Sequence, residues 1–329
     1  MKQYFLLLGI IGIIILSCEK NDDIDNEKND KNNEFSIDSL VTISSNLPFA
    51  GYRDLMFIDE KTGYVLSDNF IGKTTDGGYS WTTYSIDYSV YTKKIQFTDN
   101  QIGYIIAGKN NSGILLKTTD GGQSWNTIDL NTSECPVGLI FLNNDTGFIT
   151  GKDLFVKTTN GGKTWINLKK DDTFKYFLGV NFKNNNEGIV TALNGECFIT
   201  SDGGQNWNSF YATDYLSDDI YFVEDKTLIS RNTNPWFDLT NRKEIASPPG
   251  YSKSVFFNSK QSIAAGIHYA ELGYFPYNDI YITNDGWKTY SQTTLSSTAS
   301  RPCIAKMSDS KVMIIYSSLG DTYVTILKK

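Results

Sequence analysis

The sequence contains few of the residues from which metal sites and catalytic sites are most often built. It has one histidine, His268, which excludes histidine-rich metal sites and leaves little room for a histidine acid or base. Apart from Cys18, its cysteines are Cys135, Cys197 and Cys303, an odd number without paired spacing. This predicts neither a disulfide framework nor a zinc site, and Cys197 and Cys303, which lie in apolar runs, are expected to be inert buried thiols. We therefore expect no metal and no cofactor.

Long apolar segments with a helical period are also missing, and proline is scarce. Aromatic residues make up 14% of the chain, and its apolar runs are short and separated by Gly, Asn and Asp. Short, punctuated runs of this kind predict an all-β protein. The 294 residues from 36 to 329 are enough to bury a substantial core.

Positive charge is in the minority along the chain. The formal net charge is −7, and a net charge of −4 remains for residues 36–329 once the N-terminal segment is set aside. Such a chain lacks the basic excess that neutralises phosphates, so we expect no nucleic-acid partner.

The N-terminus carries an apolar run of thirteen residues, YFLLLGIIGIIIL, at residues 4–16. It is too short to span a membrane comfortably and fits the core of a signal peptide. The run ends in Leu16-Ser17-Cys18, which resembles a lipobox, the site where bacterial lipoproteins are lipidated on cysteine and cleaved before it. We expect residues 1–17 to be a lipoprotein signal peptide and Cys18 to carry the lipid anchor. The alternative is an uncleaved anchor with an incidental cysteine.

Residues 18–35 follow as an Asn-rich segment with seven acidic residues, three lysines and one aliphatic residue. Such a segment cannot bury enough apolar surface to fold, which predicts a flexible tether between the membrane and residues 36–329. Acidic residues directly after a lipidated cysteine also resemble the export signal of surface lipoproteins in some Gram-negative bacteria. A solubilising spacer is the alternative. We expect an outer-membrane lipoprotein of the bacterial cell envelope, with exposure at the cell surface as the further expectation.

One eight-residue phrase recurs through the rest of the chain. It reads TTDGGYSW (Thr74–Trp81), TTDGGQSW (Thr118–Trp125), TTNGGKTW (Thr158–Trp165), TSDGGQNW (Thr200–Trp207) and, in a more divergent form, TNDGWKTY (Thr283–Tyr290). Short apolar runs on both sides predict two strands joined by a tight turn. The Asp or Asn accepts hydrogen bonds from amides ahead of it, the glycines supply positive φ, and the aromatic residue covers the hairpin. These residues therefore have a structural explanation and do not form a catalytic row: Asp76, Trp81, Asp120, Trp125, Asn160, Trp165, Asp202, Trp207, Asp285 and Tyr290.

The pattern T-x-[DN]-G-G-x-[ST]-W resembles the Asp-box, or BNR repeat, of sialidases, sortilin-type receptors and some glycoside hydrolases. The longer unit at residues 97–128 is similar, more narrowly, to the repeat of the photosystem II assembly-factor family. That repeat joins F-x-[DN], a Gly-aromatic strand and a terminal DGG-x-[ST]-W. The resemblance implies a β-propeller and a role of the same kind as that of an assembly factor. The fold itself is shared among unrelated activities.

The spacing of the repeat counts the blades. Successive boxes lie 44, 40 and 42 residues apart, and the last interval of 83 is two periods, so one unit has lost its box. Repeats of this length predict four-stranded propeller blades. The unit without a box spans residues 218–249, a sixth unit follows, and residues 301–329 supply three more strands. The missing fourth strand is residues 39–45. We predict a seven-bladed β-propeller of four-stranded antiparallel blades whose last blade is closed by the N-terminal strand, which leaves no open edge in the ring.

Hydrolase chemistry finds little support in the residues. Sialidases that resemble this fold use three arginines and a tyrosine nucleophile assisted by a glutamate, and the Arg-Ile-Pro motif is absent. The only arginines are Arg53, Arg231, Arg242 and Arg301. Another glycosidase would need two carboxylates facing each other at about 5–10 Å. Asp54 and Asp218 or Asp219 begin inner strands and could face the axis, although solvated aspartates at strand ends are common. We expect no catalytic residue.

Aromatic and basic residues directly precede the predicted inner strands of five blades. They are Tyr52, Arg53, Tyr91, Lys93, Lys94, Lys175, Tyr176, Tyr251, Lys253 and Arg301. In a propeller these positions share one face around the mouth of the central channel. Aromatic faces with long cationic donors suit sugars, carboxylates or an acidic peptide loop. Alternatively, the tyrosines pack between blades and the cations keep the rim solvated.

Three functions remain open. The favoured one is a non-catalytic, lipid-anchored propeller that binds a protein or scaffolds an assembly at its central funnel. The others are a carbohydrate-binding protein of the cell surface and, less favoured, a glycoside hydrolase or sialidase. A broad shallow face favours the first, an aromatic platform the second, and convergent carboxylates in a funnel the third.

Overall fold

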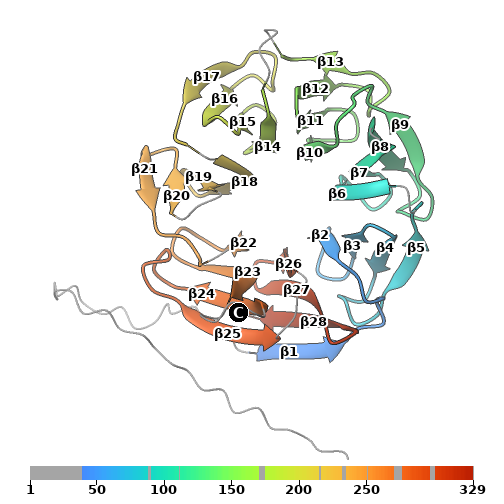
Figure 1. Ribbon diagram of the computed structural model, residues 1–329, viewed down its shortest axis with the longest axis vertical. Helices are drawn as coiled ribbons and strands as arrows, with labels where there is room; N and C mark the ends of the chain where they lie inside the picture. Colours follow the sequence, from blue (N-terminus) through green and yellow to red (C-terminus); the bar gives the residue numbers. More distant parts are fainter. Residues whose placement is uncertain are drawn as a thin grey trace, which may run out of the picture.

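The computed structural model describes residues 39–87, 90–110, 112–169, 175–214, 216–231, 235–249, 251–269, 276–296 and 301–328. The expected signal peptide, Cys18 and the acidic tether lie outside these ranges. The described residues form seven four-stranded antiparallel sheets arranged as the blades of a ring (Figure 1). The predicted seven-bladed propeller is confirmed. Among these residues no apolar helix of membrane-spanning length occurs.

The first four blades contain the four well-preserved boxes. Blade 1 is β2 (Tyr52–Phe57), β3 (Gly63–Ser67), β4 (Phe70–Thr74) and β5 (Thr82–Ser85). Blade 2 is β6 (Val90–Phe97), β7 (Gly103–Lys109), β8 (Ser112–Thr118) and β9 (Asn126–Asp129). Blade 3 is β10 (Pro136–Phe141), β11 (Gly147–Gly151), β12 (Leu154–Thr158) and β13 (Ile166–Asn167). Blade 4 is β14 (Phe177–Phe182), β15 (Gly188–Ala192), β16 (Glu196–Thr200) and β17 (Asn208–Tyr211).

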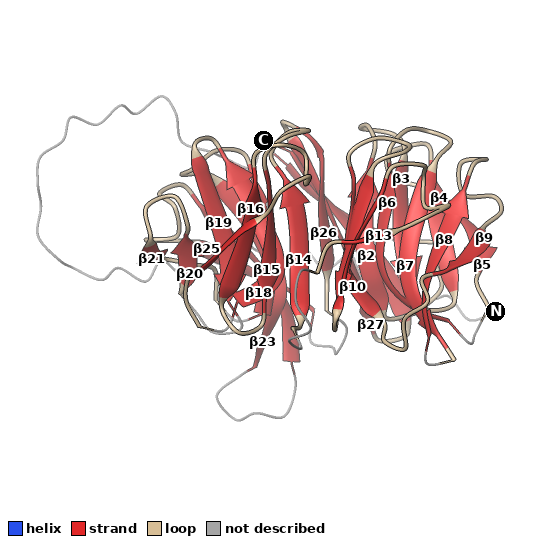
Figure 2. Cartoon of the chain, turned by 90° about the horizontal axis from the view of Figure 1, so that it is seen from above, coloured by secondary structure: helices blue, strands red, loops and turns tan. Residues whose placement is uncertain are grey.

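The last three blades depart further from the repeat. Blade 5, which has no box, is β18 (Leu216–Val223), β19 (Lys226–Arg231), β20 (Trp236–Asp238) and β21 (Lys243–Ile245). Blade 6 is β22 (Tyr251–Phe256), β23 (Ser262–Tyr269), β24 (Pro276–Thr283) and β25 (Ser291–Ser296). Blade 7 is β26 (Cys303–Ser308), β27 (Lys311–Ser318), β28 (Asp321–Lys328) and β1 (Ser39–Ser44). In each blade the first strand is innermost, and the strands run between two faces of loops (Figures 1 and 2).

The N-terminal strand closes the ring as the sequence predicts. β1 pairs antiparallel with β28 from Ser39 opposite Lys328 to Ser44 opposite Tyr323. The first strand of the described chain therefore completes the blade formed by the last three.

A phenylalanine and a glycine shape the turn between the first two strands of blades 1 to 4. In blade 2, Phe97 lies opposite Gly103, and a Cβ on Gly103 would lie 2.6 Å from the Phe97 ring. The absent side chain lets the ring cross its partner strand. Asp99 fixes the same turn, because its Oδ1 accepts hydrogen bonds from the amides of Gln101 and Ile102, each at 2.7 Å.

The same phenylalanines join neighbouring blades. The ring of Tyr64 in blade 1 stacks on Phe97 of blade 2 with centroids 3.7 Å apart, and Tyr104 of blade 2 stacks on Phe141 of blade 3 at 3.5 Å. Tyr64 and Tyr104 are fully buried. The core is thus a series of apolar layers between blades, and each layer uses residues that recur once per repeat.

Each box forms the turn between the third and fourth strands. In blade 1, Thr74 Oγ1 donates to Asp76 Oδ1 at 2.8 Å and accepts from the amide of Gly78 at 2.8 Å. Asp76 Oδ1 also accepts from the amide of Ser80 at 3.0 Å, and the buried Trp81 donates its Nε1 hydrogen to Gly78 O at 3.1 Å. The side chains of Thr74, Asp76, Ser80 and Trp81 are therefore hydrogen-bonded within the turn.

In the divergent box of blade 6 (Thr283–Tyr290), a different aromatic residue is buried. Tyr290, expected to cover the hairpin, is 47% exposed, whereas Trp287 is 4% exposed. Trp287 occupies the place of the second glycine with φ 72, and its amide donates to Thr283 Oγ1 at 3.0 Å. The indole replaces the usual tryptophan from inside the turn, so the expectation for Tyr290 needs this correction.

A lysine that precedes the box connects successive blades. The ammonium groups of Lys73, Lys117 and Lys157 donate to the carbonyls of the first box glycine in the next blade, at 2.8–2.9 Å. The corresponding residues of blades 4 and 6 are Ile199 and Ile282, and the blades that follow them have no box. The lysine is thus present in three blades that are each followed by a blade with a well-preserved box.

Candidate functional site: the central channel

The inner strands of blades 1 to 3 each carry one extra residue that faces the central channel. In β2, Tyr52 pairs with Ser67 and Asp54 with Leu66, which leaves Arg53 as the bulged residue. The equivalent irregularities leave Lys93 in β6 and Val137 in β10. All three residues line a cavity at the hub. A bulge re-aims side chains in this way, and bulges are common next to functional sites.

The bulge contains more residues in the inner strands of the next two blades. Leu178 and Gly179 of β14 lie between paired residues where β15 has only Thr191. In β18, three residues from Ser217 to Asp219 lie opposite Ser230 alone. A Cβ on Gly179 would lie 2.4 Å from Asp218 O, so the glycine permits this close approach of the two inner strands.

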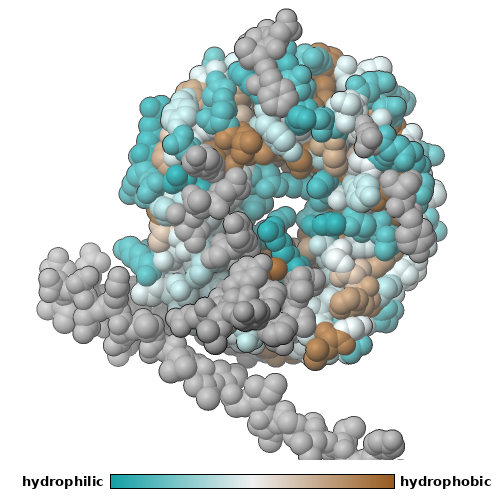
Figure 3. Space-filling model, viewed as in Figure 1, coloured by the Kyte–Doolittle hydropathy of each residue, from teal (hydrophilic) through white to brown (hydrophobic). Residues whose placement is uncertain are grey.

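The hub cavity has a volume of about 660 Å³ and draws residues from all seven blades. Figure 3 shows hydrophilic residues around most of the central opening, with an apolar patch over β10 and β14. The lining residues are Tyr52, Arg53, Lys93, Lys94, Val137, Tyr176, Leu178, Leu193, Ser217, Asp218, Asp219, Ser230, Arg231, Trp236, Ser252, Lys253, Ala265, Arg301, Pro302 and Cys303.

The structure brings together most of the predicted rim. Its members in the cavity wall are Tyr52, Arg53, Lys93, Lys94, Tyr176, Lys253 and Arg301. Tyr91 and Lys175 do not line the cavity, and the side chain of Tyr251 lies outside the described part of the chain. The residues from β2, β6 and β22 lie within the inner strands and not before them, because each of these strands begins earlier than expected.

Tyr52 and Lys175 of the predicted rim have local structural partners. Tyr52 is 5% exposed, and its hydroxyl donates to Pro48 O at 2.7 Å. Burial raises the pKa of Tyr52 to about 12. Lys175 forms an ion pair with Glu196 at 3.3 Å and lies 5.1 Å from the centroid of the Phe198 ring. For these two residues the alternative reading, in which rim side chains pack or are paired locally, fits better than ligand binding.

The cavity wall is rich in basic residues although the protein is acidic. Its ionisable lysines, arginines and carboxylates are Arg53, Lys93, Lys94, Arg231, Lys253, Arg301, Asp218 and Asp219. Six cations thus line the wall together with two carboxylates in a chain with net charge −7. Two of the six, Arg53 and Arg231, are paired with Asp68 and Glu244, which lie outside the cavity lining. Lys93 is exposed, and within the described residues it forms no ion pair. This wall can attract anionic groups, and its low-dielectric surroundings strengthen that attraction.

An ion pair crosses the channel. Lys94 Nζ of blade 2 lies 3.2 Å from Asp218 Oδ2 of blade 5. Blades 2 and 5 are not neighbours, and β6 and β18 lie on opposite sides of the opening (Figure 1). The Lys94 side chain is 23% exposed and that of Asp218 is 40% exposed, so water reaches both groups.

Lys253 of blade 6 completes the charged cluster. Burial alone would raise the pKa of Asp218, but the ammonium groups of Lys94 and Lys253 outweigh it and lower that pKa. The pKa of Asp219 is raised, chiefly because burial penalises its charged form. Burial acts to lower the pKa of Lys253, but the carboxylates of Asp219, Asp54 and Asp218 outweigh it and raise that pKa. The cluster therefore keeps Lys253 charged and moves the pKa values of the two neighbouring aspartates in opposite directions.

Other residues that could carry chemistry are used structurally. Asp54 Oδ2 accepts a hydrogen bond from the amide of Ile95 at 3.1 Å, which joins the inner strands of blades 1 and 2. Cys303 lines the cavity but is 6% exposed, and burial raises its pKa to about 12. Cys197 is fully buried, and its pKa is raised to about 12 for the same reason. Neither thiol is a nucleophile at neutral pH. Among the described residues, no three metal-ligating side chains gather into a site.

A family model supplies the identity of the repeat. It describes the photosynthesis system II assembly factor YCF48 and matches residues 41–136 and 123–225, which together span more than half of the chain. The chain belongs to the YCF48 family. A direct comparison with curated protein sequences gave no match.

Solved structures of YCF48 share the same ring. A YCF48 bound to a D1 peptide has a TM-score of 0.64 at 18% identity, over 90% of this chain and 98% of that one. YCF48 from Cyanidioschyzon merolae has a TM-score of 0.63 at 14% identity, over 87% and 98%. The GH74 xyloglucanase from Xanthomonas campestris has a TM-score of 0.60 at 11% identity, over 84% of this chain but 52% of that enzyme. At these identities the likeness establishes the fold alone.

Two residues of the hub cannot be predicted from the YCF48-type repeat. Arg231 and Trp236 come from the blade without a box and line the cavity, yet neither was expected there. Arg231 ends β19 and Trp236 begins β20, in the blade that has no box by which the repeat could be aligned. Arg231 was recognisable only as one of four arginines in the chain.

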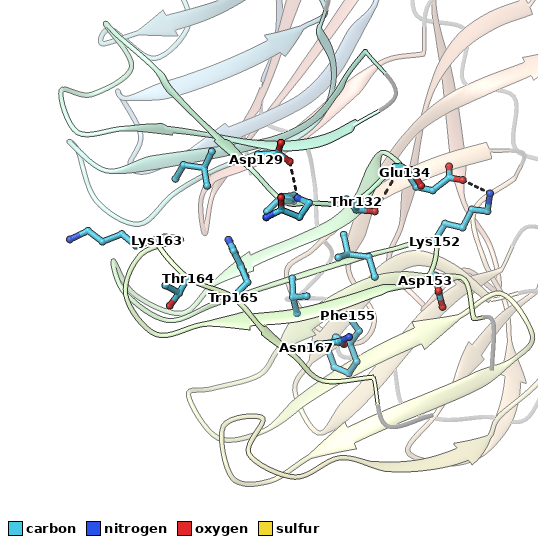
Figure 4. Close-up of a pocket in the computed structure, with 16 residues that line it drawn as sticks. Asp129, Thr132, Glu134, Lys152, Asp153, Phe155, Lys163, Thr164, Trp165 and Asn167 are labelled. Carbon is cyan, nitrogen blue, oxygen red and sulfur yellow. Dashed lines mark hydrogen bonds and ion pairs between the residues drawn. The ribbon is translucent and has the colours of Figure 1, made fainter. Parts of the chain in front are cut away.

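A second cavity lies away from the hub. It has a volume of about 680 Å³ and is bounded by β9, the loop that follows β9, and strands β12 and β13 (Figure 4). The Glu134 carboxylate pairs with Lys152 in its wall, and Trp165 of the third box contributes to the lining. The box thus belongs to the outer part of the blade, whereas the predicted rim belongs to the hub.

Proposed function

We propose that the protein is a non-catalytic, lipid-anchored scaffold that binds an acidic segment of a partner protein in its central channel. The observation that carries this proposal is the set of six cations around the hub of an acidic propeller. Basic side chains from different blades can bind several carboxylates of one segment at once, which favours a chain over a single small anion.

Membership of the YCF48 family supports a protein partner in kind. One of the similar structures is a YCF48 bound to a D1 peptide, so a propeller of this family can take a peptide ligand. The corresponding ligand of the present chain would be set by its own lining, since the two proteins share 18% of their residues.

The proposed location is the bacterial outer membrane. Its support is the lipobox resemblance at Leu16-Ser17-Cys18 and the acidic, Asn-rich tether that follows. A tether of this composition would hold the propeller away from the bilayer and leave its channel accessible to a partner. Acidic residues next to Cys18 further support display at the cell surface.

Selection from a phage library of short random peptides tests the binding function. The wild-type propeller is expected to enrich peptides rich in Asp and Glu, with affinities that fall as salt is added. Lys93→Glu is expected to weaken the enriched peptides at least about tenfold, because it reverses an unpaired cation of the wall. Lys183→Glu, on an exposed loop residue outside the cavity, is the matched control. Equal affinity for both variants would remove the channel from consideration.

Glycoside hydrolysis is the second candidate, because the cavity does contain two carboxylates whose pKa values are moved apart. Asp218 and Asp219 are consecutive residues of one strand, however, and glycosidases place their carboxylates on either side of the scissile bond. Release of reducing ends from xyloglucan by the wild type, with loss of that activity in Asp219→Asn, would support hydrolysis over binding.

A further inference from the structure

The ion pair across the channel occupies the place where a ligand would bind. Lys94 and Asp218 come from opposite blades and meet at 3.2 Å inside the cavity. Ion pairs that water can reach contribute about 0–1 kcal/mol, so this pair can open at little cost. When a ligand separates the two groups, Lys94 loses its carboxylate, and Asp218 keeps Lys253 of the cluster but loses its ion-pair partner.

The loss of these partners restricts the ligand's chemistry. A purely anionic segment would satisfy Lys94 but would leave the carboxylate of Asp218 next to its own charges. A purely cationic segment would satisfy Asp218 but would be repelled by Lys94 and Lys253. Repulsion between like charges in a confined site is a common source of selectivity. A segment that brings a carboxylate and a basic group together avoids both penalties.

We propose that the bound segment contains an acidic residue beside a lysine or arginine. Its basic group replaces Lys94 as the partner of Asp218, and its acidic group replaces Asp218 as the partner of Lys94. The inference rests on the proposed function and specifies its ligand. The acidic group binds the cations of blade 2, Lys93 and Lys94, and the basic group binds the two aspartates of blade 5.

The shape of β18 independently supports a binding role for blade 5. Its bulge is the widest among the inner strands and places two consecutive aspartates in the cavity wall. Asp218 has Lys94 as its partner, whereas within the described residues Asp219 makes no ion pair and no side-chain hydrogen bond. Burial raises the pKa of Asp219, and a ligand cation beside it would reverse that effect.

The peptides enriched by the wild-type propeller provide the test. We expect them to carry Lys or Arg within a few residues of Asp or Glu. A synthetic copy of an enriched peptide, with its basic residue replaced by glutamine, should bind the wild type at least about fivefold more weakly. On the Asp218→Asn/Asp219→Asn variant, the same replacement should change affinity less than about twofold, because the partner of the basic group has been removed.

Controls separate this inference from loss of fold and from failure of the proposed function. Asp145→Asn alters an exposed aspartate outside the cavity and should keep the full fivefold effect. Thermal unfolding and near-UV circular dichroism establish that each variant is folded. Enrichment of peptides with acidic residues alone would overturn the inference and leave the proposed function standing. An equal effect of the glutamine replacement on the wild type and the double variant would do the same. No enrichment of any peptide class would overturn both.

Discussion

At the residue scale, the repeat works through pairs of side chains that each solve one local problem. Phe97 and Gly103 form such a pair, since the ring crosses the strand only where its neighbour has no Cβ. Lys117 and the carbonyl of Gly161 form another, which links blade 2 to blade 3 at 2.9 Å. These residues were visible in the sequence as a pattern, but their partners in the next blade were not.

The Phe–Gly pair predicts a specific loss of stability. Gly103→Ala should reduce the free energy of unfolding by about 1–3 kcal/mol, because the new methyl group overlaps the Phe97 ring. Gly51→Ala is the matched control, since a Cβ there meets nothing within 4 Å. Urea titrations of the two variants measure the difference. Equal stabilities would contradict the assigned role of the pair.

The boxes predict a dependence of stability on pH. Hydrogen bonds from the amide and side chain of Asn206, with others in the turn, lower the pKa of Asp202 to about 2. An unfolded aspartate titrates near about 3.9. The contribution of Asp202 is therefore present above about pH 4 and is lost as the pH falls towards its folded pKa.

Exchange of Asp and Asn between boxes tests this dependence in both directions. Asn160 already forms the same turn, because its Oδ1 accepts from the amide of Thr164 at 2.9 Å. Asp202→Asn should keep the turn and make unfolding less sensitive to pH between about 4 and 2, whereas Asn160→Asp should make it more sensitive. Denaturant titrations at several acidic pH values measure both slopes. Unchanged slopes in both variants would argue against ionised box aspartates as acid-sensitive groups.

At the element scale, the ring depends on one strand that is far from its partner in the sequence. β1 completes the blade formed by β26 to β28, and Ile43 packs against its apolar core. Without β1, strand β28 would present an unpaired edge. The prediction of this strand succeeded because the blade count left three C-terminal strands without a fourth.

Disruption of β1 should therefore destabilise the whole ring. Val41→Pro/Ile43→Pro removes two backbone donors from the strand and is expected to cost roughly 2–4 kcal/mol. The exposed edge of β28 should also cause association that grows with protein concentration. Val41→Thr/Ile43→Val keeps the strand and is the control. Thermal unfolding and light scattering check the two effects, and a monomeric double-proline variant of wild-type stability would refute the role of β1.

Inner-strand bulges show where prediction from the sequence stopped. The register of β18 is set by its contacts with β14 and β19, so the three-residue bulge has no local signature. The sequence pattern places the cations on the rim but contains no relation between them and the aspartates of blade 5. Only the folded ring shows that Lys94 and Asp218, 124 positions apart, meet across the channel.

At the scale of the whole molecule, positive charge is locally concentrated in an acidic chain. The formal net charge is −7, yet six of the 30 lysines and arginines line the hub. Cations concentrated in a channel can attract anionic groups even where the net charge of the chain is negative. In the proposed function the anchor supplies the location and the hub supplies the binding.

The anchor can be tested separately from the hub. Cys18→Ala should move the protein from the membrane fraction to the soluble fraction of cells, because a single cysteine would carry the lipid. Metabolic labelling with a palmitate analogue should mark the wild type and not the variant. Cys135→Ala, which changes a partly buried thiol of the propeller, is the control. Labelling that survives Cys18→Ala would rule out the proposed anchor.

The sequence by itself determined the number of blades, the closure of the ring and the structural role of the boxes. These follow from local turn chemistry and a fixed period, which every repeat carries within its own residues. Tertiary structure alone decided which side chains reach the channel, because bulges and contacts between blades set the direction of each inner strand. It also decided that the hub combines many cations with one acidic pair, since those charges come from blades that meet only when the ring is closed.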